Sequence, residues 1–327
     1  MDAMAGTAHP VVALTGATGF IGAVLRERLL AAGYRVRALY RPRPGRVLQG
    51  AERLTWVAGD LDDHAALAAL LEGAEAVVHG AGSVRGARRA DFDRVNETGV
   101  LNLVRAAERE AGCRRFLLLS SLAAREPQLS DYARSKRLGE QALATNARRL
   151  AWAVLRPPAV YGPGDREMLP LFRSMARGLA PVPGKGDGRF SLLHVADLAS
   201  AVVAWLDGHG ESGRTYELDD GHERGYDWDT LLAIASRVLR NHAPIRRLSI
   251  PLPCLRLAAG INLAAARIFG YAPMLTPGKV REITHADWVG DGSALTKATG
   301  WRPLIGFERG LADTLGKPIA ALNGVSR

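Results

Sequence analysis

The sequence predicts an α/β protein: a doubly wound parallel sheet followed by a smaller, mainly helical C-terminal lobe. Short apolar runs of strand length alternate with helical segments through the first half of the chain, which is typical of a parallel sheet. With 36 glycines and only 6% aromatic residues, the composition suits tight turns between strands and helices. We expect a disordered leader over residues 1–9, a first domain over 10–162, and a lobe over 163–327 with segments that return to the first domain.

Length and charge restrict the possible functions. A chain of 327 residues can bury a large core, and its formal net charge of +10 permits binding to anionic partners. The sequence has no basic tail and no basic run interleaved with aromatic residues, so we predict no nucleic-acid partner. Cys113 and Cys254 are too few for a disulfide framework, and the N-terminus lacks a signal-peptide pattern, which predicts a cytoplasmic protein. We predict no spanning helix and no metal site.

The first strand leads into a glycine-rich turn. Residues Pro10–Thr15 form an apolar run, and Gly16, Gly19 and Gly22 follow at three-residue spacing, before and within a helix expected over Phe20–Ala32. Such glycines allow a tight strand exit, approach of the backbone to a pyrophosphate, and close helix packing, while the helix N-terminus attracts phosphate. The spacing differs from GxGxxG, but the strand before it and the helix after it favour a Rossmann-type dinucleotide site over a purely structural turn.

The second strand, predicted over Arg35–Tyr40, indicates which dinucleotide is bound. A site for NAD would place a carboxylate at its end to bind the ribose hydroxyls, but this strand ends in Tyr40-Arg41-Pro-Arg43. An arginine can pair with a 2′-phosphate, so Arg41 favours NADP(H) over NAD(H). The alternative is that these arginines belong to a solvated loop.

Two further strands are expected over Leu54–Ala58 and Ala76–His79. Asp60, after the first of them, has two equally supported roles: it accepts a hydrogen bond from the adenine amino group, or it caps the following helix. After the second, Ala81 and Gly82 offer small residues where the backbone passes close to a cofactor.

Serines end the fifth strand, expected over Arg115–Ser121, after a long helix over Asp91–Ala111 that carries Asn96. Ligands collect at the carboxyl ends of strands in doubly wound sheets, which exposes Ser121 to a bound ligand. A sixth strand over Trp152–Arg156 then runs into a proline-rich turn.

Tyr132 and Lys136 form the candidate catalytic pair. They lie four residues apart in a segment expected to be helical over Ser130–Arg149, so both side chains share one helical face. An adjacent ammonium favours the phenolate and lowers the pKa of a phenol from its usual ~10. Only five of the 43 basic residues are lysines, so a lysine here is not the default choice.

Jointly these motifs resemble the extended short-chain dehydrogenase/reductase family, which includes nucleotide-sugar epimerases and dehydratases and the 3β-hydroxysteroid dehydrogenases. The resemblance rests on TGATGFIG, GDL, the serine strand end, YARSK, LRPPAVYGPGD, HVAD and TGWRP, which span nearly the whole chain. It implies a nicotinamide cofactor, Tyr132 as general acid/base, Lys136 binding the ribose and lowering the phenol pKa, Ser121 bonding the reacting oxygen, and Asn96 in the relay. The implied cofactor contacts are Gly16, Thr18, Gly19, Phe20, Ile21, Gly22, Arg41, Asp60, Leu61, Ala81, Gly82, Tyr132, Lys136, Pro157 and Val160.

The resemblance leaves the substrate class open. Sugar-nucleotide members usually carry a valine-tyrosine-glycine run and a longer insertion between the serine and the tyrosine, whereas here Leu122–Arg125 follows Ser121 and the insertion is short. The most apolar stretch, Ile250–Gly270, is interrupted by arginines. It suits either core or dimer packing, or the wall of a hydrophobic pocket that touches a membrane surface through its arginines.

Three functions follow from these patterns. We expect an NADP(H)-dependent oxidoreductase that interconverts a hydroxyl and a keto group on a bulky apolar small molecule, such as a sterol or an oxo-ceramide. The alternatives are a nucleotide-sugar epimerase or dehydratase, and a non-catalytic NADPH-binding structural or sensor subunit. We also expect a homodimer, which is common in the family that the chain resembles, and a cytoplasmic location that includes peripheral membrane contact.

Overall fold

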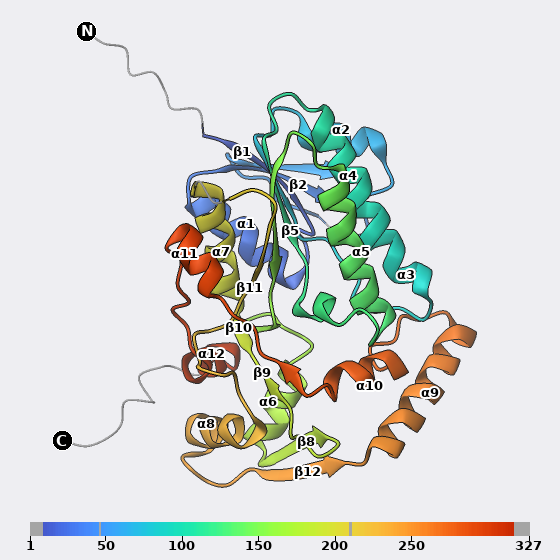
Figure 1. Ribbon diagram of the computed structural model, residues 1–327, viewed down its shortest axis with the longest axis vertical. Coiled ribbons are helices and arrows are strands. Elements are labelled where there is room, and N and C mark those ends of the chain that lie inside the picture. The colour runs from blue at the N-terminus through green and yellow to red at the C-terminus, as the bar shows by residue number, and fades with distance from the viewer. Residues whose placement is uncertain (1–8, 46, 209–210, 317–327) are drawn as a thin grey trace, which may run out of the picture.

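A seven-stranded parallel sheet forms the upper part of the molecule in the computed structural model, which describes residues 9–45, 47–208 and 211–316 (Figure 1). The strand order is β11-β6-β5-β4-β1-β2-β3, so the order reverses between β1 and β4, as in a doubly wound sheet. Most of the leader expected over residues 1–9 lies outside the described residues. The strands are β1 (Val11–Thr15), β2 (Arg35–Tyr40), β3 (Leu54–Ala58), β4 (Ala76–His79), β5 (Arg115–Leu119), β6 (Ala151–Arg156) and β11 (Arg214–Glu217).

Helices cover both faces of this sheet because its strands are apolar on both sides. One core layer lies between the sheet and α1 (Phe20–Ala31), α7 (Val195–Asp207) and α11 (Ser293–Thr299). The other lies under α2 (His64–Leu71), α4 (Gly99–Arg109) and α5 (Asp131–Asn146). The predicted Rossmann-type fold is confirmed.

The helix expected over Asp91–Ala111 is not continuous. It consists of α3 (Arg89–Asp93), a π-helical turn η1 (Arg94–Thr98) and α4. The wide turn lies against α5, where a Cβ added to Gly139 would come within 2.1 Å of the Asn96 carbonyl oxygen. This close approach of the two backbones places Asn96 beside the helix that carries Tyr132.

The lower part of the molecule is a smaller lobe with a core of its own. Its core contains Tyr161, Phe172, Tyr226 and Phe307, whose rings meet edge to face or at a tilt. The lobe comprises three short strand pairs, β7 (Ala159–Tyr161) with β10 (Leu192–His194), β8 (Leu179–Pro183) with β12 (Arg246–Ile250) and β9 (Arg189–Phe190) with β13 (Asp287–Trp288), and the helices α6 (Leu169–Ala176), α8 (Trp228–Arg240), α9 (Leu252–Phe269), α10 (Pro277–Ile283) and α12 (Phe307–Thr314).

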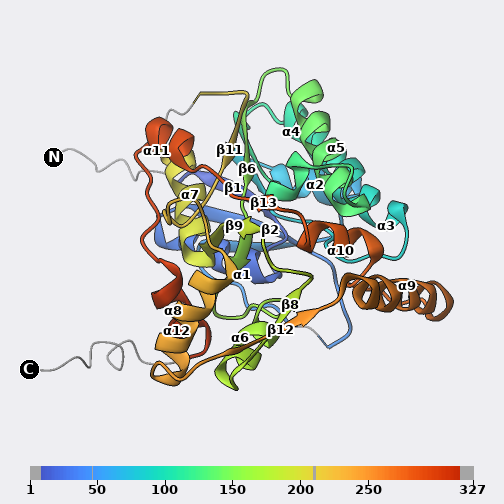
Figure 2. The same cartoon turned by 60° about the horizontal axis from the view of Figure 1, so that its bottom comes forward.

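Two helices of the lobe define one side of the site. α10 lies close to the N-terminal end of α5, and α9 extends away from the rest of the molecule at its edge (Figure 2). By length and composition α9 is the one described helix that could cross a membrane, with a mean hydropathy of 1.3 and 17% of the helix buried.

Candidate active site

The glycine turn after β1 fits a dinucleotide. Gly16 has φ +74°, and a Cβ there would lie 2.6 Å from the Gly80 carbonyl oxygen, while a Cβ at Gly22 would lie 2.0 Å from the Gly16 oxygen. The turn therefore packs directly on the end of β4 and on the first turn of α1. Gly19 caps α1 without a side-chain hydrogen bond, so the first backbone N–H groups of the helix remain available to a phosphate.

Gly82 lies between two predicted site residues. A Cβ on Gly82 would be 3.3 Å from Asn96 Oδ1 and 3.6 Å from Lys136 Nζ. One residue earlier, the Ala81 N–H donates to Thr15 Oγ1 over 3.2 Å, which joins the ends of β1 and β4. The structure thus brings Ala81, Gly82, Asn96 and Lys136 together at the carboxyl edge of the sheet.

Asn96 uses its amide to hold this edge in place. Its Oδ1 accepts from the Ser83 N–H, and its Nδ2 donates to the Ser83 carbonyl and to Ser135 Oγ, each over 2.9 Å. Ser135 Oγ in turn donates to the Tyr132 carbonyl over 2.8 Å. Asn96 is buried and its amide is fully bonded within the chain, so it positions the loop at Ser83 against the helix that carries Tyr132.

The Ser121 side chain lies near the Tyr132 phenol and lowers its pKa. β5 ends two residues earlier than predicted, and Ser121 is the N-cap of the short 3-10 helix η2 (Leu122–Arg125) that follows. Tyr132 lies in the first turn of α5. Burial raises the pKa of the Tyr132 phenol, while Ser121 and the charge of Lys279 lower it. A tyrosine with a raised pKa carries a proton at neutral pH and can donate it to a carbonyl oxygen.

Lys136 contacts the sheet. Its Nζ donates to the Leu119 carbonyl at the end of β5 over 2.7 Å, and burial lowers the pKa of the ammonium to about 8, against the opposing charge of Glu140. The sequence assigned the lowering of the phenol pKa to Lys136. In the structure Lys279 also lowers this pKa, while Lys136 Nζ donates to the end of β5, and the effect of Lys136 on the phenol remains a prediction.

A buried polar cluster below Lys136 was not predicted. Glu140, one turn further along α5, accepts from Ser120 Oγ over 2.5 Å and from Arg156 Nε over 2.8 Å. The Arg156 guanidinium also donates to the second carboxylate oxygen over 2.6 Å. Because the charge of Glu140 is held by Arg156 and Ser120, the cluster fixes the end of β5, the end of β6 and α5 relative to one another. The sequence feature that could have indicated this cluster is a polar residue at the end of each of two apolar strands, Ser120 and Arg156.

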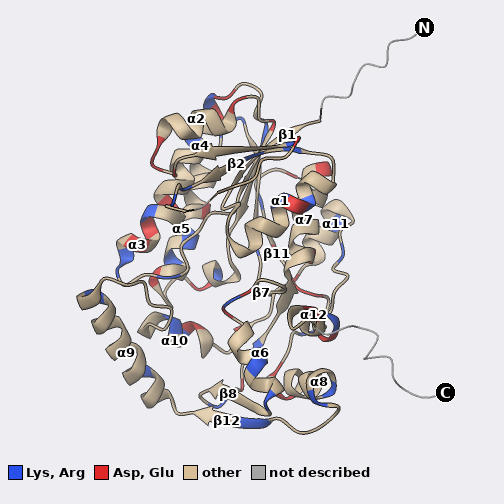
Figure 3. Cartoon of the chain, turned by 180° about the vertical axis from the view of Figure 1, so that it is seen from behind, with Lys and Arg blue, Asp and Glu red and all other residues tan. Residues whose placement is uncertain are grey.

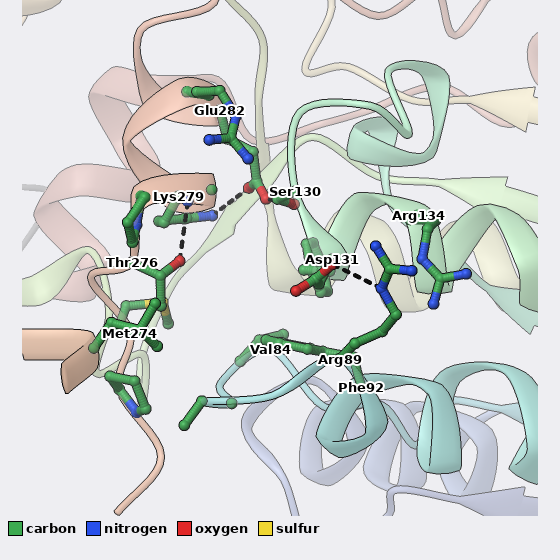
Figure 4. Close-up of a pocket in the computed structure, with 18 of the residues that line it drawn as sticks. Val84, Arg89, Phe92, Ser130, Asp131, Arg134, Met274, Thr276, Lys279 and Glu282 are labelled. Atoms are coloured by element: carbon green, nitrogen blue, oxygen red, sulfur yellow. Dashed lines mark hydrogen bonds and ion pairs between the residues drawn. The ribbon is translucent and has the colours of Figure 1, made fainter. Parts of the chain in front are cut away.

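A pocket of about 340 Å³ opens beside Tyr132. α10 contributes Lys279 and Glu282: Lys279 Nζ lies 2.8 Å from the Glu282 carboxylate, which also accepts a hydrogen bond from the Ser130 hydroxyl (Figure 4). Ser130 is the N-cap of α5 and accepts from the Ala133 N–H over 2.9 Å. A chain of contacts therefore joins the lobe to the start of the helix that carries Tyr132.

Only part of the apolar stretch Ile250–Gly270 reaches this pocket. Leu263 and Arg267 of α9 line it, as do Phe92 and Met274 from other segments. Leu257 and Ile261 are exposed and are not among its lining residues. Of the stretch that the sequence offered as a pocket wall, only one edge of α9 lines the pocket. Only a few residues of the helix are buried as the alternative of core packing requires.

The predicted contacts with the adenosine part of the cofactor lie just after the ends of β2 and β3. Arg41 is exposed directly after β2. Asp60 accepts from the Asp62 N–H over 2.9 Å, and Asp63 caps α2 instead, so the capping interpretation of Asp60 was wrong because the helix begins later. Leu61 is buried against Gly99. The roles of Arg41, Asp60 and Leu61 in binding remain predictions.

The remaining predicted cofactor contacts flank the glycine turn. Thr18, Phe20 and Ile21 are all partly buried, and the ring of Phe20 lies near Gly164, in the turn after β7. Pro157 accepts from the Leu122 N–H over 2.9 Å, and Val160 lies in β7. The segments after β5 and β6 are thus in contact, as are the start of α1 and the turn after β7, and their part in binding is a prediction.

Comparison with known proteins agrees with this geometry. A ceramide reductase of Caulobacter vibrioides is 38% identical over 318 residues, covering 95% of each chain. Sterol demethylase protein B of Methylococcus capsulatus is 29% identical over 64% of this chain and 69% of its own. Among solved structures, the Bordetella bronchiseptica enzyme WbmH in complex with NAD⁺ has a TM-score of 0.71 at 22% identity, covering 94% of this chain and 98% of its own, which supports the fold.

The sequence model of the NAD dependent epimerase/dehydratase family matches residues 12–218, which include the glycine turn, Ser121, Tyr132 and Lys136. The resemblance to extended short-chain dehydrogenases/reductases is therefore confirmed, and with it an enzyme that uses a nicotinamide dinucleotide in oxidoreduction. The chain belongs to the NAD dependent epimerase/dehydratase family.

Proposed function

We propose that this protein is an NADP(H)-dependent reductase of a keto group on a ceramide-type lipid. The observation that carries the proposal is that Tyr132, whose phenol lies near Ser121, forms part of the wall of a pocket shared with α9 and α10. The similarity to a ceramide reductase over 95% of both chains supports the substrate class.

Each residue of the site has a separate role in the proposed reaction. When bound, the reduced nicotinamide supplies a hydride to the carbonyl carbon of the substrate. Tyr132 donates its proton to the carbonyl oxygen, and Ser121 stabilises the charge that develops on that oxygen by a hydrogen bond. The Lys136 ammonium, beside Gly82 and the end of β5, holds the nicotinamide ribose in register. The same residues run the oxidation of the alcohol in reverse.

The preference for NADP(H) rests on Arg41. This side chain is exposed where β2 ends, and the segment Tyr40-Arg41-Pro-Arg43 contains no carboxylate to bind a free 2′-hydroxyl. A guanidinium can form a bidentate pair with a 2′-phosphate.

Thermal stabilisation by NADPH and by NADH tests the cofactor. A ligand at ~100-fold its Kd stabilises a folded protein by about 2.7 kcal/mol, and we expect NADPH to do so at lower concentration than NADH. Arg41→Ala should weaken the NADPH effect and leave the NADH effect unchanged, whereas Arg302→Ala, at an exposed arginine outside the site, should change neither. A stronger response to NADH that is indifferent to Arg41 would contradict the preference.

Turnover tests the substrate. We expect NADPH consumption with a dispersed oxo-ceramide, and a loss of roughly 10²-fold or more in Tyr132→Phe because the proton donor is removed. Turnover or stabilisation by a nucleotide diphosphate sugar instead would favour the epimerase alternative. Absence of turnover in a protein that binds NADPH would favour a structural or sensor subunit, although such a subunit has no need of the Ser121–Tyr132 contact.

Assembly and location remain proposals. We infer a cytoplasmic homodimer formed through a helix pair, which measurement of the molar mass in solution tests.

A further inference from the structure

α9 presents a continuous apolar face to solvent. At about 100° per residue, its buried residues Leu255, Ala259 and Ala266 fall within about 40° of one another, and they face α10. On the other side, Leu257, Ile261 and Ile268 are likewise within about 40° of one another, and they are 66%, 61% and 77% exposed. The helix lies at the edge of the molecule, with no other described helix or strand drawn beyond it (Figures 1 and 2).

Arginines line one edge of this face. Arg256 and Arg267 lie about 20° apart on the helical wheel, on the pocket side of the exposed apolar face, and Arg267 itself lines the pocket. The helix carries no acidic residue and is almost uncharged along its length (Figure 3). This is the pattern of a helix that lies in a membrane interface, with apolar side chains in the acyl region and cations at the headgroups.

We propose that α9 docks the protein on the surface of a bilayer that contains anionic phospholipid. The proposal rests on the proposed function, because it supplies the route by which a ceramide-type lipid reaches Tyr132. The helix lies in the plane of the surface and does not cross the bilayer, since both its ends return to the same body: β12, before it, pairs with β8, and α10, after it, bonds to Ser130.

The pocket continues from this surface. Leu263 and Arg267 of α9 line the same pocket as Tyr132, so a lipid that leaves the bilayer along this edge of the helix arrives beside the phenol. A volume of about 340 Å³ is near the lower limit for sites of small organic ligands, so it holds the reacting part of the lipid while long chains remain outside. A membrane against α9 provides an apolar environment for those chains.

A second copy of the chain fits this face less well. The 18 residues of α9 form a strip about 27 Å long and about 10 Å wide, whereas a stable interface buries about 800 Å² on each partner. Two such faces would also bring the arginine edges of both copies close together. An anionic bilayer needs no minimum contact area of this kind, and its negative charge attracts the arginines.

Flotation with vesicles tests the docking. The full-length protein is mixed with phosphatidylcholine vesicles containing increasing phosphatidylglycerol, and the bound fraction is measured against Leu257→Gln/Ile261→Gln/Ile268→Gln. We expect binding that grows with phosphatidylglycerol content. Because each buried leucine or isoleucine contributes about tenfold to partitioning, the triple variant should bind at least about tenfold more weakly. Arg256→Gln should weaken binding only to the anionic vesicles.

Controls separate docking from folding and from catalysis. Val47→Gln/Leu304→Gln replaces two apolar side chains that are similarly exposed elsewhere, and it should bind vesicles as the unchanged protein does. The triple variant should keep its melting temperature, its stabilisation by NADPH and its turnover of a water-soluble short-chain ketone, while losing at least about tenfold in turnover of vesicle-embedded substrate.

Two outcomes would overturn the proposal. The first is failure of the unchanged protein to float with any vesicle. The second is vesicle binding unaffected by the triple variant together with conversion of a dimer to a monomer, which would assign the face to a second copy. Neither result depends on the identity of the substrate, so the docking can fail while the proposed reaction stands, and a protein that floats but reduces no keto-lipid would contradict only the reaction.

Discussion

Lys279 Nζ lies 5.8 Å from the centroid of the Tyr132 ring, and its charge lowers the pKa of the Tyr132 phenol. The two residues are 147 positions apart in the sequence. Because Lys279 belongs to α10 and Tyr132 to α5, the lobe supplies a charge beside the candidate proton donor.

We predict that Lys279→Met moves the basic limb of the pH profile of kcat to higher pH. Two unit charges about 6 Å apart interact by about 2–3 kcal/mol at an effective dielectric constant of ~20, and the neighbouring Glu282 offsets part of this, so a shift of about one pH unit is expected. Lys279→Arg should restore most of the profile. Lys297→Met, in α11, is the matched control and should leave it unchanged; equal profiles for both methionine variants would contradict the role of Lys279.

We predict that Ser130→Ala lowers both stability and kcat. The substitution removes the N-cap of α5 and the hydrogen bond to Glu282, so a loss of about 1–2 kcal/mol in the free energy of unfolding is expected by denaturant titration. Since Tyr132 lies in the first turn of this helix, kcat should fall more than KM changes. Asp227→Ala removes the N-cap of α8 and should cost similar stability without reducing kcat. Equal effects of the two variants on kcat would indicate that Ser130 acts only on folding.

We predict that Gly22→Ala abolishes dinucleotide binding. The added Cβ would lie 2.0 Å from the Gly16 backbone oxygen, so the turn and α1 must separate. Thermal stabilisation by NADPH should disappear, and circular dichroism shows whether the protein remains folded. Gly260→Ala is the opposite case, because its added Cβ meets nothing within 4 Å beyond the backbone of its own helix. We expect the free energy of unfolding to increase by about 0.5–1 kcal/mol, since alanine favours the helix. Retention of NADPH binding by Gly22→Ala would show that the turn is less tightly packed than the structure indicates.

Elements with strong local patterns were predictable from the sequence. β2, β3 and β4 have the expected bounds, since each is a short apolar run ended by turn residues. The glycine turn and the pair Tyr132 and Lys136 were also recognisable, because their spacing in the sequence directly sets their geometry.

Features that depend on contacts across the chain were not predictable. The π-helical turn at Asn96 lies where Gly139 of α5 approaches its carbonyl, and no local pattern signals that contact. In the sequence Glu140 looks like an exposed helix residue. In the structure its carboxylate bonds to Ser120 and Arg156, which lie at the ends of two strands. Lys279 follows no motif, and only the rarity of lysine in this chain could have drawn attention to it.

The Lys136 ammonium gives the last prediction, a loss of NADPH affinity at moderately alkaline pH. Burial disfavours the charged form and lowers the pKa to about 8, so above this pH the side chain loses its proton and with it the charge that holds the ribose. The Kd of NADPH, measured by fluorescence titration, should rise as the pH increases through about 8. Lys136→Met should bind more weakly throughout and lose this dependence, because the titrating group is absent. An unchanged pH dependence in Lys136→Met would assign the titration to another residue and leave Lys136 with a packing role at the end of β5.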